Sequence, residues 1–298
     1  MDNRDFNLYK IFLTLYELKS ISKTANKLYV SQPAISYSLK ELESQLGYSL
    51  FYRNSKGIEP TIEAMELYSY ISTAFNIIKS GEEHVTNLNS LNIGTIRIGA
   101  HSYIASYYLC DFICEFRKLY PGVKFEVICK STTDLIDLLD TRKIDLVIGQ
   151  LPISINNKAA CKKMLTTFNS CFVYNKKLLH NYKIETPEDL TKYPLILPNA
   201  KSSFRIKLDE TFERRNLKLN SIVEAWTVEF MLEMIKKGAG IGFCAKNVVD
   251  SINDDDTFET VTFDNILPTM DICAVYLNDF ERPVLTKFVE FLSEKGNN

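Results

Sequence analysis

The chain has 298 residues, of which 46% are hydrophobic and 24% charged, as is ordinary for a globular protein of two or three domains. Its net charge of −2 argues against a protein coated by nucleic acid, although residues 1–60 carry eight basic and six acidic side chains, a local charge of +2. We find no signal peptide and no apolar run near the ~20 residues that span a bilayer. We therefore expect a cytoplasmic protein with no membrane partner, whose seven cysteines are reduced thiols.

A first amphipathic helix is predicted around Leu8–Leu15, and two short helices joined by a tight turn follow between Ile21 and Leu46. Ser22 is a candidate N-cap of the first of these two helices, and Ser31 is a candidate N-cap of the second. Pro33 falls in the first turn of the second helix, where its missing N–H costs little. The pattern thus predicts a helix-turn-helix.

The second helix of this pair has one apolar face and one polar face. Its apolar stripe is formed by Ile35, Leu39, Leu42 and Leu46. Its other side and its exposed N-terminal end carry Ser31, Gln32, Pro33, Ser36, Tyr37 and Lys40. This arrangement is typical of a helix that reads bases in the major groove, although an ordinary surface hairpin fits the same pattern.

A polar turn at residues 53–57 is flanked by short extended segments, which indicates a small β wing. Arg53 and Lys56 would then lie where DNA backbone phosphates approach, unless they are simply solvated. These elements make residues 1–60 a candidate DNA-binding domain. Residues 61–91 follow as a long helix with a narrow apolar seam, for which a second copy of the chain is the expected partner.

Beyond residue 92 strands and helices alternate, which indicates parallel α/β units. A break at residues 151–157 and another at Leu267-Pro268 predict two crossovers between two similar lobes. We assign lobe 1 to residues 92–160 and 268–298 and lobe 2 to residues 161–267, with a cleft between them. The fold class is α/β, with the helix-turn-helix and the long helix preceding this two-lobed domain.

Several polar residues follow strands of these lobes and open helices, which is where α/β lobes bind ligands. They are His101, Ser102, Tyr103, Ser131, Thr132, Lys201, Ser202, Ser203, Trp226 and Thr227. Each Ser or Thr alone is explained as a helix N-cap. Four such turns meeting at one cleft would hold a small polar or anionic effector, and Lys201 with the helix N-termini suits a carboxylate.

No catalytic or metal-binding motif is recognisable, so we expect neither an enzyme, nor a cofactor, nor a metal site. The glycine-rich run Gly238–Gly242 follows a helix and precedes a strand, the reverse of the order in a dinucleotide site, and a helix C-cap explains it better. Cys110 and Cys114 stand one helical turn apart, where they could share a metal or form a redox pair, but packing in the core is the stronger interpretation.

The residues from Ala25 through Ser31-Gln32-Pro33-Ala34-Ile35-Ser36 to Leu46-Gly47, with Leu50-Phe51 and Arg53, resemble the DNA-binding domain of LysR-type transcriptional regulators. The resemblance covers the whole plan: winged helix-turn-helix, linker helix, and an effector domain like the periplasmic binding proteins. It implies that Gln32, Pro33 and Ser36 approach bases, that Arg53 meets the DNA backbone, and that Ser102, Thr132, Ser202 and Thr227 line the effector cleft. Tyr37 replaces an arginine common in the family, and Met65 replaces a glycine at the start of the linker helix.

The resemblance implies a ligand-responsive regulator that binds an inverted-repeat DNA operator as a homodimer or homotetramer, with RNA polymerase as a further partner. Two alternatives belong to other classes. A solute-binding module without a DNA role would need only the two lobes, and a thiol-based redox regulator would use Cys110 and Cys114.

Overall fold

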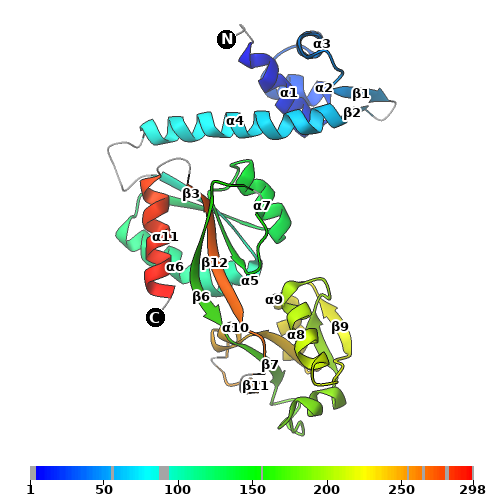
Figure 1. Ribbon diagram of the computed structural model, residues 1–298, viewed down its shortest axis with the longest axis vertical. Helices are drawn as coiled ribbons and strands as arrows, with labels where there is room; N and C mark the ends of the chain where they lie inside the picture. Colours follow the sequence, from blue (N-terminus) through cyan, green and yellow to red (C-terminus); the bar gives the residue numbers. More distant parts are fainter. Residues whose placement is uncertain are drawn as a thin grey trace. The chain divides into compact units, whose positions relative to one another are not determined.

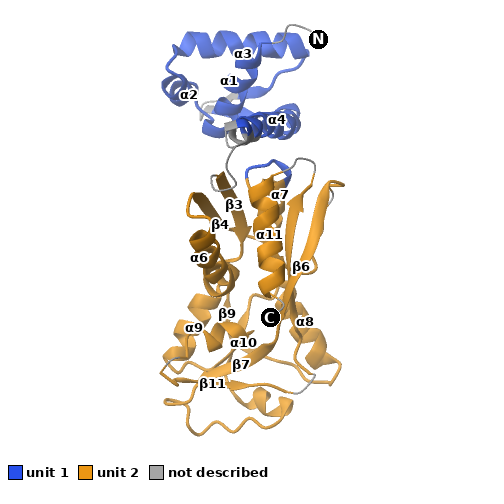
Figure 2. Cartoon of the chain, turned by 90° about the vertical axis from the view of Figure 1, so that its left-hand side faces the viewer, with its two compact units in different colours: residues 1–86, 140–143 blue, residues 87–139, 144–298 orange. Residues whose placement is uncertain are grey.

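The computed structural model describes residues 5–54, 57–86, 94–155, 157–253, 255–263, 266–278 and 282–296. The chain forms two compact units, shown in different colours in Figure 2. Unit 1 comprises residues 1–86 and 140–143, and unit 2 comprises residues 87–139 and 144–298. Lys56, a predicted phosphate contact, lies outside the described residues, as do residues 87–91 of the predicted linker helix.

Unit 1 is built from helices and one small hairpin. Its elements are α1 (Phe6–Leu18), α2 (Ile21–Leu28), α3 (Gln32–Leu46), β1 (Phe51–Asn54), β2 (Gly57–Pro60) and α4 (Ile62–Thr86). Strands β1 and β2 pair antiparallel from Phe51 opposite Pro60 to Asn54 opposite Gly57. The predicted helix-turn-helix, wing and long helix therefore all form.

Local capping explains where α2 and α3 begin and end. Ser31 accepts a hydrogen bond from the Ala34 N–H at 3.3 Å, so it caps α3 as predicted. The N-cap of α2 is Ser20 and not Ser22, because the Ser20 hydroxyl accepts from the Lys23 N–H at 3.4 Å. Tyr29 ends α2 in the left-handed conformation at φ 57°, which makes the turn tight.

The apolar stripe of α3 is buried. Leu39 and Leu42 belong to one core with Phe12 and Leu15 of α1, and Leu50 closes it from the segment before the wing. The Glu43 carboxylate accepts the Leu50 N–H at 2.7 Å, which fixes the chain as it leaves α3. Because this stripe fills the core, the side chains on the opposite face of α3 are not needed for packing.

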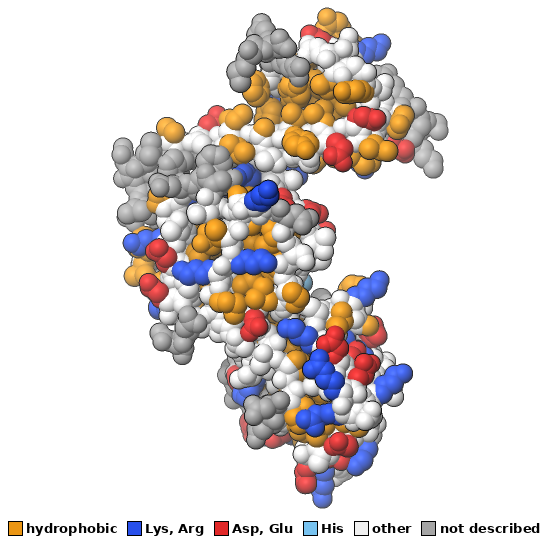
Figure 3. Space-filling view, viewed as in Figure 1, with side chains coloured by type: hydrophobic (Ala, Val, Ile, Leu, Met, Phe, Trp, Pro, Cys, Tyr) orange, Lys and Arg blue, Asp and Glu red, His pale blue; other side chains and the backbone are white. Residues whose placement is uncertain are grey.

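Helix α4 exposes an apolar surface on unit 1. Thr61 caps the helix by accepting the Ala64 N–H at 3.1 Å. Large apolar side chains along it that stay exposed are Ile62, Met65, Tyr70, Ile78 and Val85. Figure 3 shows apolar side chains gathered on the visible face of this unit. Several exposed large apolar side chains on one helix are typical of a surface that another protein covers.

Unit 2 consists of two lobes, each built on a five-stranded sheet (Figure 1). The lobe 1 sheet has the order β4-β3-β5-β12-β6. Its strands are β3 (Gly94–Ala100), β4 (Val123–Cys129), β5 (Leu146–Gln150), β6 (Ala160–Phe168) and β12 (Met270–Leu277). The lobe 2 sheet has the order β11-β7-β10-β8-β9. Its strands are β7 (Ser170–Asn175), β8 (Leu195–Pro198), β9 (Ser221–Ala225), β10 (Ile241–Ala245) and β11 (Phe258–Val261).

Both sheets are mixed, whereas the alternation of elements predicted parallel units. Strands β3, β4 and β5 are parallel, as are β8, β9 and β10. Strands β12 and β6 join the first sheet antiparallel, and β7 and β11 join the second in the same way. These antiparallel strands are the ones that lead from one lobe to the other.

The first crossover lies later than residues 151–157. Strand β6 pairs with β12 along its length, so the chain leaves the lobe 1 sheet only after Phe168, which differs from the expected lobe boundary at residue 160. The return crossing, at Leu267-Pro268, precedes β12 as predicted. The two crossings touch, because the Ser170 hydroxyl donates to the Pro268 carbonyl at 2.5 Å.

Helices flank both sheets. Lobe 1 carries one continuous helix made of α5 (Ser102–Ile104), the π-helical turn η1 (Ala105–Leu109) and α6 (Cys110–Leu119), together with α7 (Thr132–Asp140) and α11 (Pro283–Gly296). Lobe 2 carries η2 (Pro187–Lys192), α8 (Ser203–Glu213), α9 (Val228–Lys236) and α10 (Lys246–Asp250). A π turn therefore interrupts an otherwise α-helical segment from Ser102 to Leu119.

The glycine-rich run is a helix C-cap followed by a strand, as the order of elements indicated. Gly238 takes the left-handed conformation at φ 75°, and its N–H donates to Ile235 at 2.8 Å. Gly240 has a φ of 154°, and a Cβ there would lie 2.4 Å from a backbone carbonyl oxygen of Pro194. The glycines therefore serve the end of a helix and a close approach of two backbone segments.

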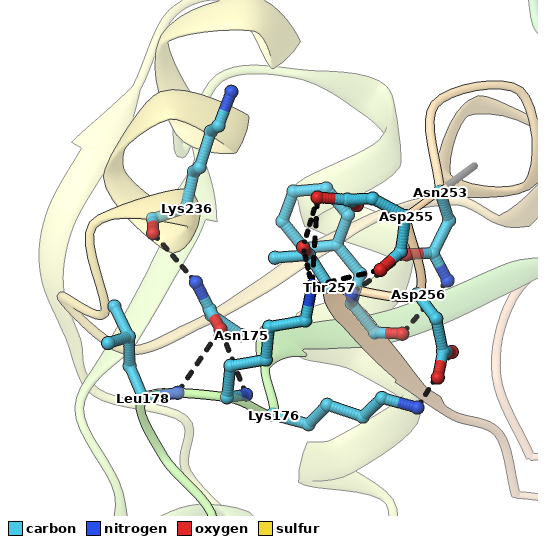
Figure 4. A network of polar contacts seen from close by, with 10 residues as sticks. Asn175, Lys176, Leu178, Lys236, Asn253, Asp255, Asp256 and Thr257 are labelled. Atoms are coloured by element: carbon cyan, nitrogen blue, oxygen red, sulfur yellow. Dashed lines mark hydrogen bonds and ion pairs between the residues drawn. The ribbon is translucent and has the colours of Figure 1, made fainter.

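A polar network joins the ends of β7, α9 and β11 in lobe 2 (Figure 4). The buried Asn175 side chain donates to the Lys236 carbonyl at 2.7 Å and accepts the N–H groups of Lys177 and Leu178 at 3.0 and 3.2 Å. Lys176 pairs with Asp256 at 2.7 Å on the exposed side. The Asn175 amide thus forms hydrogen bonds with backbone N–H and carbonyl groups that lie at the ends of a strand and a helix.

Candidate functional site

The polar face of α3 is presented to solvent. Gln32, Pro33, Tyr37 and Lys40 are exposed and Ser36 is half-buried, whereas Ile35 and Leu39 on the other face are buried. Ser31 is exposed, and its hydroxyl oxygen caps the helix as an acceptor, so its O–H can still donate a hydrogen bond. Tyr37 is 70% exposed although it is aromatic, and Tyr29 in the preceding turn is 96% exposed. The helix therefore offers amide, hydroxyl, phenol and ammonium groups that serve no packing purpose.

The wing places Arg53 on β1, opposite Ile58 of β2. Ile58 and Phe51 are buried in the core of unit 1 and anchor the hairpin. The predicted wing is therefore present, and Arg53 lies in it.

In lobe 1 the two strand-to-helix turns predicted from the sequence meet. The His101 Nε2 atom and the Thr132 hydroxyl lie 2.9 Å apart, which joins the end of β3 to the start of α7. Burial lowers the pKa of His101, so the imidazole is held neutral and can donate one hydrogen bond and accept another. Ser131 makes its hydrogen bonds to Asp134 in the first turn of α7.

Tyr103 connects this group of residues to Gln150, which sequence reasoning missed. The Tyr103 hydroxyl donates to Gln150 Oε1 at 3.5 Å, and its ring stacks with His101 at 6.1 Å between centroids. Burial raises the pKa of Tyr103 far above its ordinary value, so the phenol stays protonated. Gln150 ends strand β5, and its side-chain position becomes visible only in the folded sheet.

The lobes meet through Glu229, a second residue that the sequence analysis did not select. Glu229 lies in the first turn of α9 in lobe 2, and its Oε2 accepts the Ser102 hydroxyl of lobe 1 at 3.2 Å. Burial, and after it the negative charge of Glu229, raises the pKa values of Tyr107 and Cys129 in lobe 1. We name His101, Ser102, Tyr103, Thr132, Gln150 and Glu229 the interlobe junction.

The two predicted turns of lobe 2 are built mainly as helix caps. Thr227 caps α9 by accepting the Phe230 N–H at 3.2 Å, and Ser202 caps α8 by accepting the Arg205 N–H at 3.2 Å. Trp226 is 79% exposed beside the first of these caps. Lys201 is exposed, and its N–H donates to Asn199 within its own turn, from which Ser203 begins α8.

The cysteines fall into exposed and buried groups. Cys110 and Cys114 are exposed, so the predicted packing role in the core is wrong. Burial, the Cys114 neighbour and Asp111 raise the pKa of Cys110, which disfavours the thiolate, the form that reacts with oxidants. Among the described residues there is no group of three or more His, Cys, Asp or Glu that could hold a metal ion.

A helix-turn-helix with a free polar helix face, carried on one chain with two α/β lobes that meet through polar side chains, defines a DNA-binding regulator with a sensor domain. The family model described as the bacterial regulatory helix-turn-helix protein, lysR family, matches residues 6–65. The LysR substrate binding domain matches residues 89–297. The chain belongs to the LysR family of DNA-binding transcriptional regulators.

Relatives and solved structures agree with this assignment. The chain is 31% identical over 242 residues to the uncharacterized HTH-type transcriptional regulator YraN of Bacillus subtilis (strain 168), covering 80% of this chain and 79% of YraN. It is 26% identical to YoaU of the same organism, over 97% of both chains. The crystal structure of CbnR, a LysR family transcriptional regulator, has a TM-score of 0.74 at 14% identity, over 99% of this chain and 100% of CbnR. Full-length OxyR of Pseudomonas aeruginosa has a TM-score of 0.73 at 19% identity, over 99% and 95%.

Within the part of the chain that the structure describes, no helix is long and apolar enough to cross a membrane.

Proposed function

We propose that the chain is a ligand-responsive regulator whose α3 reads an inverted-repeat operator and whose interlobe junction binds a small effector. The observation that carries the DNA-reading role is the exposed polar face of α3, with Gln32 and Ser36 as base contacts. A related structure shows CbnR in complex with its target DNA, at a TM-score of 0.74 and 16% identity. Pro33, Tyr37 and Lys40 extend the same surface, and Ser31, Arg53 and Lys56 contact the DNA backbone.

The exposed apolar side chains of α4 support a dimer formed through this helix. A dimer would present two copies of α3 to two half-sites, and pairs of dimers would give a tetramer. The effector is bound by the interlobe junction together with the polar residues predicted from the sequence. The regulator acts in the cytoplasm, with RNA polymerase as a further partner.

The DNA-reading role is tested by fluorescence anisotropy with the DNA upstream of the protein's own gene. Gln32→Ala is expected to weaken binding to the specific site by ~1–3 kcal/mol, the value of a good base contact. Gln45→Ala is the matched control, because Gln45 is an exposed glutamine at the other end of the same helix. Equal losses for both variants would contradict the assignment of the reading face.

Arg53 is tested by its salt dependence. Arg53→Ala is expected to weaken specific and unrelated DNA alike and to lower the slope of log K against log salt by about one. A change in sequence preference with an unchanged salt slope would show that Arg53 contacts a base and not the backbone.

A further inference from the structure

Glu229 places a carboxylate where the two lobes meet. It lies on α9 of lobe 2 and accepts the hydroxyl of Ser102, which begins α5 in lobe 1, at 3.2 Å. The structure gives it no ion pair with any of the residues that are described. An acid in the first turn of a helix is favoured by the helix dipole, but this alone gives no reason for a contact with the other lobe.

A carboxylate at this position selects for a ligand that donates hydrogen bonds and carries positive charge. A protonated amino group has three N–H donors, and charge-assisted hydrogen bonds to a carboxylate are about twice as strong as neutral ones. The Ser102 hydroxyl can turn its proton away and accept a second of these donors. A ligand with only carboxylates would instead meet a like charge here.

Gln150, in lobe 1, favours a ligand group that accepts a hydrogen bond. Its side chain is buried at 8% exposure, and Oε1 is used by the Tyr103 hydroxyl. Its Nε2 is buried and has no hydrogen-bond partner among the described residues. Buried N–H groups are nearly always paired in folded proteins, so this one calls for an acceptor oxygen.

We propose that the effector is a zwitterion of the amino-acid class, whose protonated amino group binds Glu229 and whose carboxylate or carbonyl oxygen accepts from Nε2 of Gln150. The neutral imidazole of His101 and the Thr132 hydroxyl lie in the same group of residues and add polar partners for that oxygen. This inference rests on the proposed function, since it names the ligand class of the effector site.

The test uses the full chain and the twenty common L-amino acids, each added in a thermal-shift assay. A binder is then titrated by calorimetry beside its 2-hydroxy acid, which has the same carboxylate but no amino group. We expect the hydroxy acid to bind the unmodified chain at least tenfold more weakly. Glu229→Gln should weaken the amino acid roughly tenfold to a hundredfold and remove this difference.

Two further variants separate a ligand contact from a structural role. Glu233→Gln removes the same charge from an exposed position one turn along α9, and it should leave binding unchanged. Gln150→Met keeps the size of the side chain but removes the free N–H. It should weaken the amino acid more than the amine that lacks its carboxylate.

The inference fails if none of the twenty amino acids raises the melting temperature, or if Glu229→Gln leaves the ratio of amino acid to hydroxy acid affinity unchanged. It also fails if succinate stabilises the unmodified chain and the Glu229→Gln variant equally. That last result would contradict the ligand class but not the proposed function. The proposed function would be overturned by a different result, namely that the unmodified chain binds no specific DNA.

Discussion

Asp145 is the buried carboxylate on which we expect lobe 1 to depend most. Its side chain is 5% exposed, Oδ2 accepts the Arg97 N–H at 2.7 Å, and Oδ1 accepts the Arg282 guanidinium. Arg282 also donates to the Thr95 carbonyl at 3.3 Å, so this one carboxylate ties β3 and the start of β5 to the residue before α11.

Asp145→Ala removes both acceptors. Loss of a hydrogen bond to a charged group costs ~1.5–3 kcal/mol, and leaving the partly buried Arg97 N–H unpaired costs up to a further ~1–3 kcal/mol. The Arg282 side chain is 26% exposed and regains some hydration, which keeps the sum at about 3–5 kcal/mol. Asp145→Asn retains one acceptor but turns an NH₂ group toward another donor, so we expect roughly half of this loss.

The measurement is urea unfolding followed by far-UV circular dichroism. Glu126→Gln is the control, because Glu126 pairs with the same Arg97, at 3.4 Å, but its side chain is 41% exposed. An exposed ion pair contributes under ~1 kcal/mol, so the control should unfold close to the unmodified chain. If Asp145→Ala were no more destabilising than Glu126→Gln, the argument from buried acceptors would be refuted.

Three other predictions concern the rest of unit 2. Gly240→Ala should cost about 3 kcal/mol or more in urea unfolding, because its Cβ would lie 2.4 Å from a backbone oxygen; a loss under 1 kcal/mol would show that the backbone yields. Asn175→Ala should cost ~2–4 kcal/mol, since its buried amide makes three hydrogen bonds to backbone groups, and an unchanged midpoint would contradict this. Burial raises the pKa of Cys273 to about 11, so at pH 8 about a thousandth of it is thiolate. Ellman's reagent should label exposed Cys110 much faster than Cys273, and equal rates would refute the burial argument.

The helix-turn-helix was predictable because its signals are local. Ser31, Pro33 and the apolar spacing from Ile35 to Leu42 lie within a few residues of one another and fix the start, the cap and the buried face of α3. The error at Ser22 has the same origin, since Ser20 is an equally good cap two residues earlier. Local sequence signals place the start of a helix to within a few residues, but they do not always identify which of two neighbouring residues is the cap.

The crossover and the interlobe junction depend on contacts between distant residues. The break around residue 152 resembles the end of a lobe in the sequence. Strand β6 belongs to the first sheet only because it pairs with β12, which lies more than a hundred residues away in the chain. In the sequence, Glu229 is explained as an acidic residue in the first turn of a helix, where the helix dipole favours it. Its contact with Ser102 spans 127 residues, so no spacing rule could have selected it.

The same geometry limits how an effector can act on the DNA-reading unit. The two crossings between the lobes are joined by the hydrogen bond from Ser170 to Pro268, which favours pivoting of the lobes about this point over separation. A ligand that binds both Gln150 and Glu229 makes its full set of contacts only while the lobes are together. It can shift the equilibrium toward that state by no more than its difference in affinity for the two states, so a hundredfold difference supplies about 2.7 kcal/mol. An effector with equal affinity for both states would shift nothing. The bridging pair of Gln150 and Glu229, more than the number of polar groups in either lobe, therefore makes this junction a candidate switch.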